Sequence, residues 1–203
     1  GPSYYGGRER MDTRGHVTEN APGSHEIKDT TSSEQLERMI LEAKEFGCTG
    51  LKLYNDISFD MLKKIVPLCR EHGLKAWGHF ATFPAVAREV VEAGVETVSH
   101  VYLIDGTEGF IPAFKTKRFS PAEIERRTSI FREMARRGTI LDATVLIGMN
   151  DYRKEFVPCY VNEAYRSGVK IAAGTDWVRP QNGRINSVFM DEPYLLADTC
   201  GMR

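Results

Sequence analysis

Hydrophobic residues along this chain recur at two spacings, one typical of amphipathic helices and one typical of short strands. From Leu36 to Phe46 the apolar positions fall three or four residues apart, as on one face of a helix, and Gly47 ends the pattern. Residues 47–54, Gly-Cys-Thr-Gly-Leu-Lys-Leu-Tyr, then predict a short buried strand bounded by turn residues. A helix, a glycine and a strand therefore follow one another directly.

The same succession of helix, glycine and strand occurs five times. The glycines that end the predicted helices are Gly47, Gly73, Gly94, Gly138 and Gly168. The strands that follow them are predicted at residues 47–54, 74–79, 95–100, 139–146 and 169–175. Repeated helix and strand units are typical of a parallel α/β sheet, which closes as a doubly wound sandwich or as part of an eight-stranded barrel. No glycine-rich phosphate-binding motif follows the first strand, so the barrel is favoured.

Serine residues predict where three of the helices begin. Ser32, Ser58 and Ser120 each precede a helical pattern, and their hydroxyl groups are suited to cap the first backbone N–H groups. The other helices are expected at residues 84–93, from about 151 to 168, and from about 185 to 198, with a long loop at residues 101–119.

Residues 1–31 show no helical or strand period and are rich in Gly, Pro, Ser and Thr. We therefore expect a loop-rich segment at 1–31 and a single partial barrel domain at 32–203. The chain has 27 basic and 28 acidic residues, and no basic run alternates with aromatic residues, which argues against nucleic acid as a partner. No apolar run approaches the ~20 residues that span a bilayer, so a membrane partner is not expected either. The sequence specifies no cellular compartment.

Lys52 is the least expected residue in the first strand. Leu51 and Leu53 share one face of that strand, and Lys52 and Tyr54 share the other. Parallel strands are usually covered on both faces, where an unpaired ammonium group costs several kcal/mol. Lys52 is therefore a paired or solvent-reaching residue, a Schiff-base lysine, or a lysine carbamate that bridges metal ions.

Four ionisable residues stand at the carboxyl ends of four of the five predicted strands. They are Lys52, His79, His100 and Asp176. Each alone has an ordinary structural explanation, such as a hydrogen-bonded core histidine or a helix cap. Active sites of both α/β architectures lie at the carboxyl ends of strands, and a carbamate, imidazoles and a carboxylate are ligands that zinc accepts. The coincidence favours a metal site.

The motifs around these residues resemble those of the amidohydrolase superfamily, in its imidazolonepropionase-like and prolidase-like branch. They are Gly-Leu-Lys-Leu at Lys52, Gly-His at His79, Ser-His at His100 and Gly-Thr-Asp at Asp176. The resemblance runs from about Ser33 to the end of the chain. It implies a (β/α)8 TIM-barrel type of α/β fold, present here as a partial barrel with about five β/α units. It also implies an enzyme that hydrolyses amide, peptide-like or cyclic amide C–N bonds with a metal-activated water.

The resemblance also implies roles for individual residues. The site would hold one or two divalent metals, usually zinc. Lys52 would be the carbamylated bridging ligand, and His79 and His100 would hold the second metal. Asp176 would bind the first metal and act as general base. Tyr102, two residues after His100, is expected to touch the substrate, a small molecule or a short peptide-like compound.

The chain departs from the family in two respects. The first barrel strand of the family carries a His-x-His pair, which this sequence lacks, and strands one to three have no counterpart. We therefore expect a fragment of a longer barrel, whose open sheet edges would favour a homo-oligomer. Two alternatives stay open: a Schiff-base aldolase or lyase that uses Lys52, and a non-catalytic half-barrel that serves as an assembly module.

Overall fold

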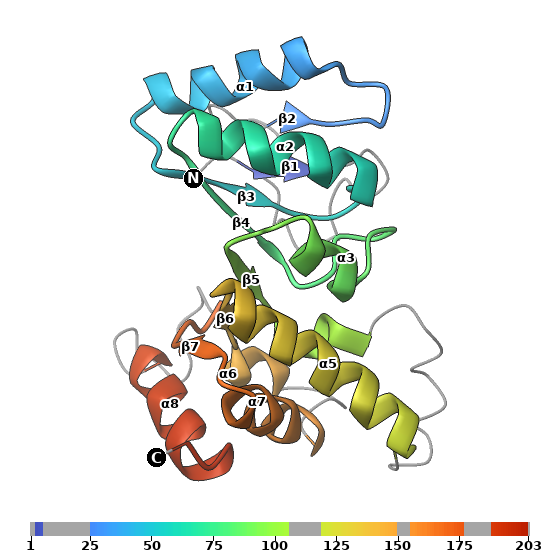
Figure 1. Ribbon diagram of the computed structural model, residues 1–203. Helices are drawn as coiled ribbons and strands as arrows, with labels where there is room; N and C mark the ends of the chain where they lie inside the picture. Colours follow the sequence, from blue (N-terminus) through green and yellow to red (C-terminus); the bar gives the residue numbers. More distant parts are fainter. Residues whose placement is uncertain (1–2, 6–24, 106–118, 150–154, 177–187, 203) are drawn as a thin grey trace. The chain divides into compact units, whose positions relative to one another are not determined.

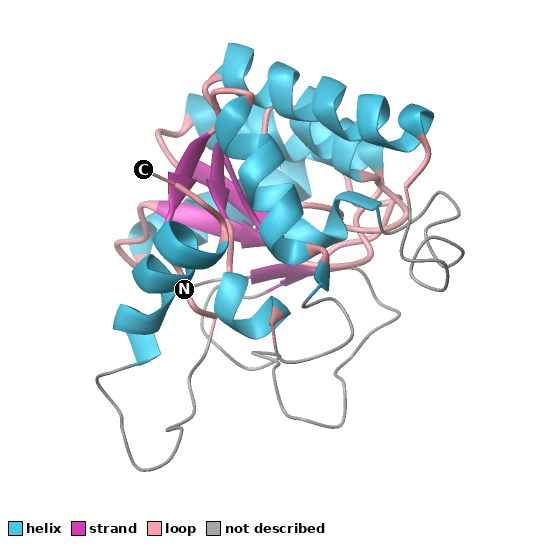
Figure 2. Cartoon of the chain, turned by 90° about the horizontal axis from the view of Figure 1, so that it is seen from below, coloured by secondary structure: helices cyan, strands magenta, loops and turns pink. Residues whose placement is uncertain are grey.

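The chain forms two compact units, Gly1–Thr97 and Val98–Arg203 (Figure 1). More of the described residues lie in helices than in strands (Figure 2). No helix within these residues has the length and hydropathy needed to cross a bilayer. The computed structural model describes residues 3–5, 25–105, 119–149, 155–176 and 188–202.

Among the described residues, the first unit contains four parallel strands in the order β2-β1-β3-β4. Their bounds are β1, Ser3–Tyr5; β2, His25–Glu26; β3, Gly50–Leu53; and β4, Lys75–His79. In the register of β3 and β4, Lys52 lies opposite Trp77. The strands β1 and β2 lie within residues 1–31, where the sequence predicted only a loop, so that prediction is wrong for these five residues. These strands have only three and two residues, too few to show an alternating pattern; β1 pairs with β3, and β2 pairs with β1.

Three helices complete the first unit: α1 (Ser33–Glu45), α2 (Phe59–Glu71) and α3 (Ala87–Glu92). The predicted caps are confirmed, since the hydroxyl groups of Ser32 and Ser58 accept hydrogen bonds from the first turns of α1 and α2. Helix α2 packs against α1, β4 and α3. Helix α3 begins three residues later than residue 84, where the sequence placed its start.

The second unit has the strand order β5-β6-β7, and β6 and β7 are parallel. Helix α5 begins after Ser120, whose predicted capping box with Glu123 is confirmed. The elements are β5, Thr97–Ser99; η1, Val101–Asp105; α5, Pro121–Arg137; β6, Ile140–Asp142; α6, Val145–Gly148; α7, Val157–Arg166; β7, Lys170–Ala172; α8, Val188–Tyr194; and the π-helix η3, Leu195–Thr199.

The five predicted glycine stops are confirmed. All five glycines that precede β3 to β7 have positive φ angles between 74° and 87°, a conformation that ends a helix and that glycine adopts without strain. The predicted α/β class with parallel strands and five β/α units is thereby confirmed. The closure of a barrel and the domain boundary between residues 31 and 32 stay predictions.

Several predicted boundaries in the second unit are wrong. The strand expected at residues 139–146 ends at Asp142, because Thr144 has a left-handed φ of 48° and the chain turns into α6. Residues 101–105 form a 3-10 helix where a loop was expected. The predicted starts of the last two helices, near residues 151 and 185, lie outside the described residues.

Candidate active site

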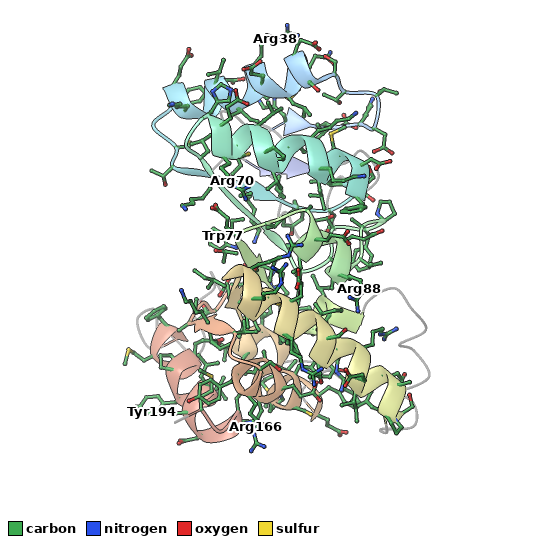
Figure 3. All side chains as sticks on the ribbon, viewed as in Figure 1. Arg38, Arg70, Trp77, Arg88, Arg166 and Tyr194 are labelled. Carbon is green, nitrogen blue, oxygen red and sulfur yellow. The ribbon has the colours of Figure 1, made fainter. Side chains whose placement is uncertain are left out.

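Lys52 lies on a half-exposed face of β3. Leu51 and Leu53 are buried and Lys52 is half-buried, so the predicted alternation is confirmed. The Nζ atom of Lys52 lies over the ring of Trp77 on β4, 4.9 Å from the ring centroid. Trp77 is itself 45% exposed, and Figure 3 labels its side chain. The ammonium group is therefore stabilised by an aromatic face, and the expectation that it lies in a fully covered interior is wrong.

His79 is the last residue of β4 and is buried. Its Nδ1 atom lies 2.9 Å from Oδ1 of Asn55, and its ring centroid lies 4.2 Å from that of Tyr54. Burial, together with the positive charge of Lys52, lowers the pKa of His79 to about 3. The imidazole is therefore neutral at physiological pH, which is the protonation state that binds metal ions.

His100 directly follows β5 and is buried in the second unit. Its backbone has a φ of 72°, and its N–H donates to the carbonyl oxygen of Asp142, 3.1 Å away. Nδ1 of the ring lies 3.0 Å from the hydroxyl oxygen of Thr144. The ring stacks on Tyr102, with centroids 5.5 Å apart and planes inclined by 28°. The position of the imidazole is thus fixed from both its polar edge and its face.

Asp176 approaches His100 after β7. Its Oδ2 atom lies 3.7 Å from Nε2 of His100, and its side chain is 53% exposed. This distance is that of a loose electrostatic contact, longer than a hydrogen bond. The structure therefore brings together His100 and Asp176 in the second unit. In the first unit, Lys52 lies close enough to His79 for its charge to lower the pKa of the imidazole.

The sequence analysis missed Asp142, a buried carboxylate at the end of β6. Its Oδ2 atom accepts a hydrogen bond of 2.9 Å from the hydroxyl group of Ser99. Its Oδ1 atom lies so close to Gly174 that a Cβ atom there would be only 2.1 Å away. Asp142 carries the same sequence signal as His100, because it is an ionisable residue at the end of a strand. The predicted strand ran on to residue 146, which hid that position.

Glu192 was missed as well, and no local signal marks it. It is fully buried on α8, and its carboxylate accepts hydrogen bonds from the backbone N–H groups of Val145 (2.6 Å) and Leu146 (2.8 Å). Burial raises the pKa of Glu192 to about 7, the nearby charge of Asp142 adds to the rise, and the two hydrogen bonds oppose it. Glu192 holds the short helix α6 in place.

The donor groups present are of the kind that zinc accepts. The neutral imidazole of His79 and the carboxylate of Asp176 are ordinary zinc ligands. Within the part of the chain that the structure describes, however, no three or more His, Cys, Asp or Glu side chains are grouped to hold a metal ion. A metal site that includes Lys52 as a carbamate stays a prediction.

No protein-family model matches the sequence, and no curated protein matches it. Solved structures share its fold at 15% sequence identity. A Xaa-Pro dipeptidase with bound methionine in its active site gives a TM-score of 0.55 over 90% of this chain and 48% of that one. An ochratoxinase from A. niger gives 0.60 over 98% and 44%. A bottromycin amidohydrolase gives 0.62 over 99% and 50%.

The chain therefore spans about half the length of these solved structures. At this level of identity the likeness establishes the fold. The type of fold that the amidohydrolase resemblance implied is thereby confirmed.

Proposed function

We propose that this chain is part of an amidohydrolase-type hydrolase that cleaves amide, peptide-like or cyclic amide C–N bonds in small molecules or short peptide-like substrates. The observation that carries the proposal is the position of Lys52, His79, His100 and Asp176. Each lies at, or within a few residues of, the carboxyl end of its strand, in the order that the family resemblance implies. The shared fold with a dipeptidase and an amidohydrolase supports it.

The proposed cofactor is one or two divalent metal ions, with zinc the expected metal. When bound, such a metal would activate the water that attacks the scissile carbonyl group. Lys52 would hold it as a carbamate, and His79 and His100 as neutral imidazoles. His79 is suited to this role because its burial keeps the pKa at about 3.

Asp176 is the proposed general base. Its carboxylate is half-exposed and can receive a proton from water, and it lies beside the imidazole of His100. A carboxylate within hydrogen-bond reach of a reacting water accepts its proton in the transition state and returns it to the leaving nitrogen. We propose Tyr102 as a substrate-binding residue, since its half-exposed ring stacks on His100 and its hydroxyl group can bond a substrate.

Zinc binding by the purified chain tests the proposal directly. We expect calorimetric titration in bicarbonate buffer to give saturable binding that is lost or strongly weakened in Lys52→Ala and in His100→Ala. His25→Ala and His72→Ala are matched controls, because each removes an imidazole that contacts a glutamate of α1, at 2.8 Å and 2.9 Å, and neither lies at the carboxyl end of β3, β4, β5 or β7. Controls that bind zinc as the unaltered chain does would support the assignment.

Two results would count against this function. Equal zinc binding by the unaltered chain, Lys52→Ala and His100→Ala would show that the metal sits elsewhere. A borohydride-trapped adduct at Lys52 with a carbonyl compound, without zinc binding, would favour the Schiff-base alternative.

A further inference from the structure

Asp142, the last residue of β6, contacts the ends of both neighbouring strands of the second unit. Strand β6 lies between β5 and β7 in the sheet (Figure 1). On the β5 side, the carbonyl oxygen of Asp142 accepts a hydrogen bond of 3.1 Å from the backbone N–H of His100, and its Oδ2 atom accepts one of 2.9 Å from the hydroxyl group of Ser99. The main chain and the side chain of one residue therefore hold the end of β5.

On the β7 side, the carboxylate of Asp142 lies against the backbone of Gly174. A Cβ atom at Gly174 would fall 2.1 Å from Oδ1 and 2.9 Å from Cγ of Asp142, so the carboxylate occupies the space that a side chain would need. Asp142 is opposite Ala172 in the register of β6 and β7, and Gly174 and Asp176 follow on the same segment. The carboxylate therefore sets how near the segment that carries Asp176 can come to β6.

His100 and Asp176, which follow the strands on either side of β6, both have left-handed backbone conformations. Their φ angles are 72° and 49°. A residue other than glycine adopts such a conformation at a cost of roughly 1–3 kcal/mol, and it persists only where the surrounding structure holds it. The two side chains approach to 3.7 Å, between Nε2 of His100 and Oδ2 of Asp176. Both segments therefore need contacts that hold them, and the buried Asp142 makes such contacts on both sides.

We propose that Asp142 is a positioning residue that sets the approach of the Asp176 carboxylate to the His100 imidazole. It acts through the backbone of His100, the hydroxyl group of Ser99 and the space left by Gly174. A buried carboxylate suits this task, because its charge strengthens the hydrogen bond that it accepts and because it fills a fixed volume in a close-packed interior. The consequence for hydrolysis rests on the proposed function, in which Asp176 is the general base, whereas the positioning itself does not.

The effect of Asp176 on the ring of His100 measures this approach. Nitrogen-15 NMR of the full chain at neutral pH, labelled at histidine, gives the signals of the ring nitrogens, and a His100→Gln variant assigns them. We expect Asp176→Asn to shift the His100 signals, because it removes a negative charge beside the ring. A similar shift is expected in an Asp142→Asn background, where the side chain keeps its volume and an acceptor oxygen. In an Asp142→Ala background the shift should be largely lost, because the distance between the two groups is no longer fixed.

Ser99→Ala gives a second measurement that keeps the carboxylate in place. It removes the hydroxyl group that donates to Oδ2 of Asp142. We therefore expect the shift caused by Asp176→Asn to be reduced in this background, though less than in Asp142→Ala. Asp142→Ala is the deciding variant where it folds, and Ser99→Ala is the deciding variant if it does not.

Asp29→Ala is the matched control. Oδ1 of Asp29 accepts a hydrogen bond from the hydroxyl group of Ser58 in the first unit, so this variant also removes a carboxylate from a serine hydroxyl. It should leave the shift caused by Asp176→Asn at full size. A shift of full size in the deciding variant overturns the inference. The absence of any shift in the otherwise unaltered chain, or its loss in Asp29→Ala, overturns it as well.

Amide hydrolysis separates this inference from the proposed function. Release of free amine from a panel of dipeptides, with zinc supplied, gives kcat and KM for the unaltered chain and its variants. Because a misplaced base impairs the chemical step, we expect Asp142→Ala to lower kcat up to about 100-fold with KM little changed, and Asp142→Asn to lower it less. No hydrolysis by the unaltered chain, together with the expected NMR shifts, would overturn the function and support the positioning role of Asp142. Equal kcat in Asp142→Ala and the unaltered chain would overturn the catalytic consequence.

Discussion

Arg127 of α5 and Glu163 of α7 form a bidentate ion pair. Nε of Arg127 donates to Oε2 of Glu163 at 3.1 Å, and Nη2 donates to Oε1 at 3.0 Å. The arginine side chain is 1% exposed. Its guanidinium group lies over the rings of Phe119 and Tyr160, 4.2 Å and 4.7 Å from their centroids. The ion pair therefore joins two helices of the second unit through a buried, desolvated guanidinium group.

Removal of either partner should destabilise the chain strongly, because it leaves a buried charge without its counter-ion. We expect Glu163→Gln to lower the free energy of unfolding by roughly 3–5 kcal/mol, measured by urea denaturation at neutral pH. Arg132 and Glu125 are the matched control, an ion pair on α5 whose side chains are 61% and 67% exposed. Glu125→Gln should cost less than about 1 kcal/mol. Equal losses in the two variants would contradict the role of burial.

Gly174 should be intolerant of any side chain. A Cβ atom there would fall 2.1 Å from Oδ1 of Asp142, so the carboxylate or the β7 loop must move. We expect Gly174→Ala to lower the free energy of unfolding by about 2 kcal/mol. In an Asp142→Ala background, the same change should cost much less, since the clashing group is gone. Equal costs in both backgrounds would show that the loss has another source.

Glu192 should make stability fall as pH rises. Its pKa is raised from 4.5 to about 7, so between these values the folded chain keeps a proton that the unfolded chain releases. Its contribution to the free energy of unfolding is complete below pH 4.5 and is lost as pH rises through about 7. Glu192→Gln should reduce the pH-dependent change in the free energy of unfolding, by roughly 3 kcal/mol at most. Urea denaturation at a series of pH values measures this change. An equal slope in Glu192→Gln and the unaltered chain would contradict the raised pKa of Glu192.

His79 should act in the opposite direction. Its pKa is lowered from 6.5 to about 3, so between these values the unfolded chain binds a proton that the folded chain excludes. Its contribution to stability is present above pH 6.5 and is lost as pH falls through about 3. We expect His79→Gln to be less sensitive to acid than the unaltered chain in that range, as followed by circular dichroism. An unchanged acid transition would contradict the low pKa.

Local signals in the sequence predicted most of the helices and strands. A capping serine and a stop glycine act within a few residues, so the ends of α1, α2 and α5 were found nearly correctly. The end of β6 was missed because apolar and β-branched residues after Asp142 suit a strand and a helix equally. The carboxylate of Glu192, 47 residues from Val145 in sequence, helps to decide for the helix.

The proposed site residues were selected from the sequence, whereas the residues that form hydrogen bonds with them were not. Strand ends are visible in the sequence, which is why Lys52, His79 and His100 were selected. Hydrogen bonds such as those between Asn55 and His79 and between Thr144 and His100 join residues 24 and 44 positions apart. Such pairs depend on distances in space that no local pattern encodes.

The N–H of Ile57 donates to the carbonyl oxygen of Thr82 at 3.1 Å, and the hydroxyl group of Thr82 donates to the carbonyl oxygen of Ile57 at 2.9 Å. These two buried hydrogen bonds limit how the segments after β3 and β4 can move. Because the two segments share two hydrogen bonds that are shielded from water, they move together or not at all. Extra space beside His79 therefore cannot arise from movement of one segment alone. Lengthening either connection by insertion would slacken its neighbour as well.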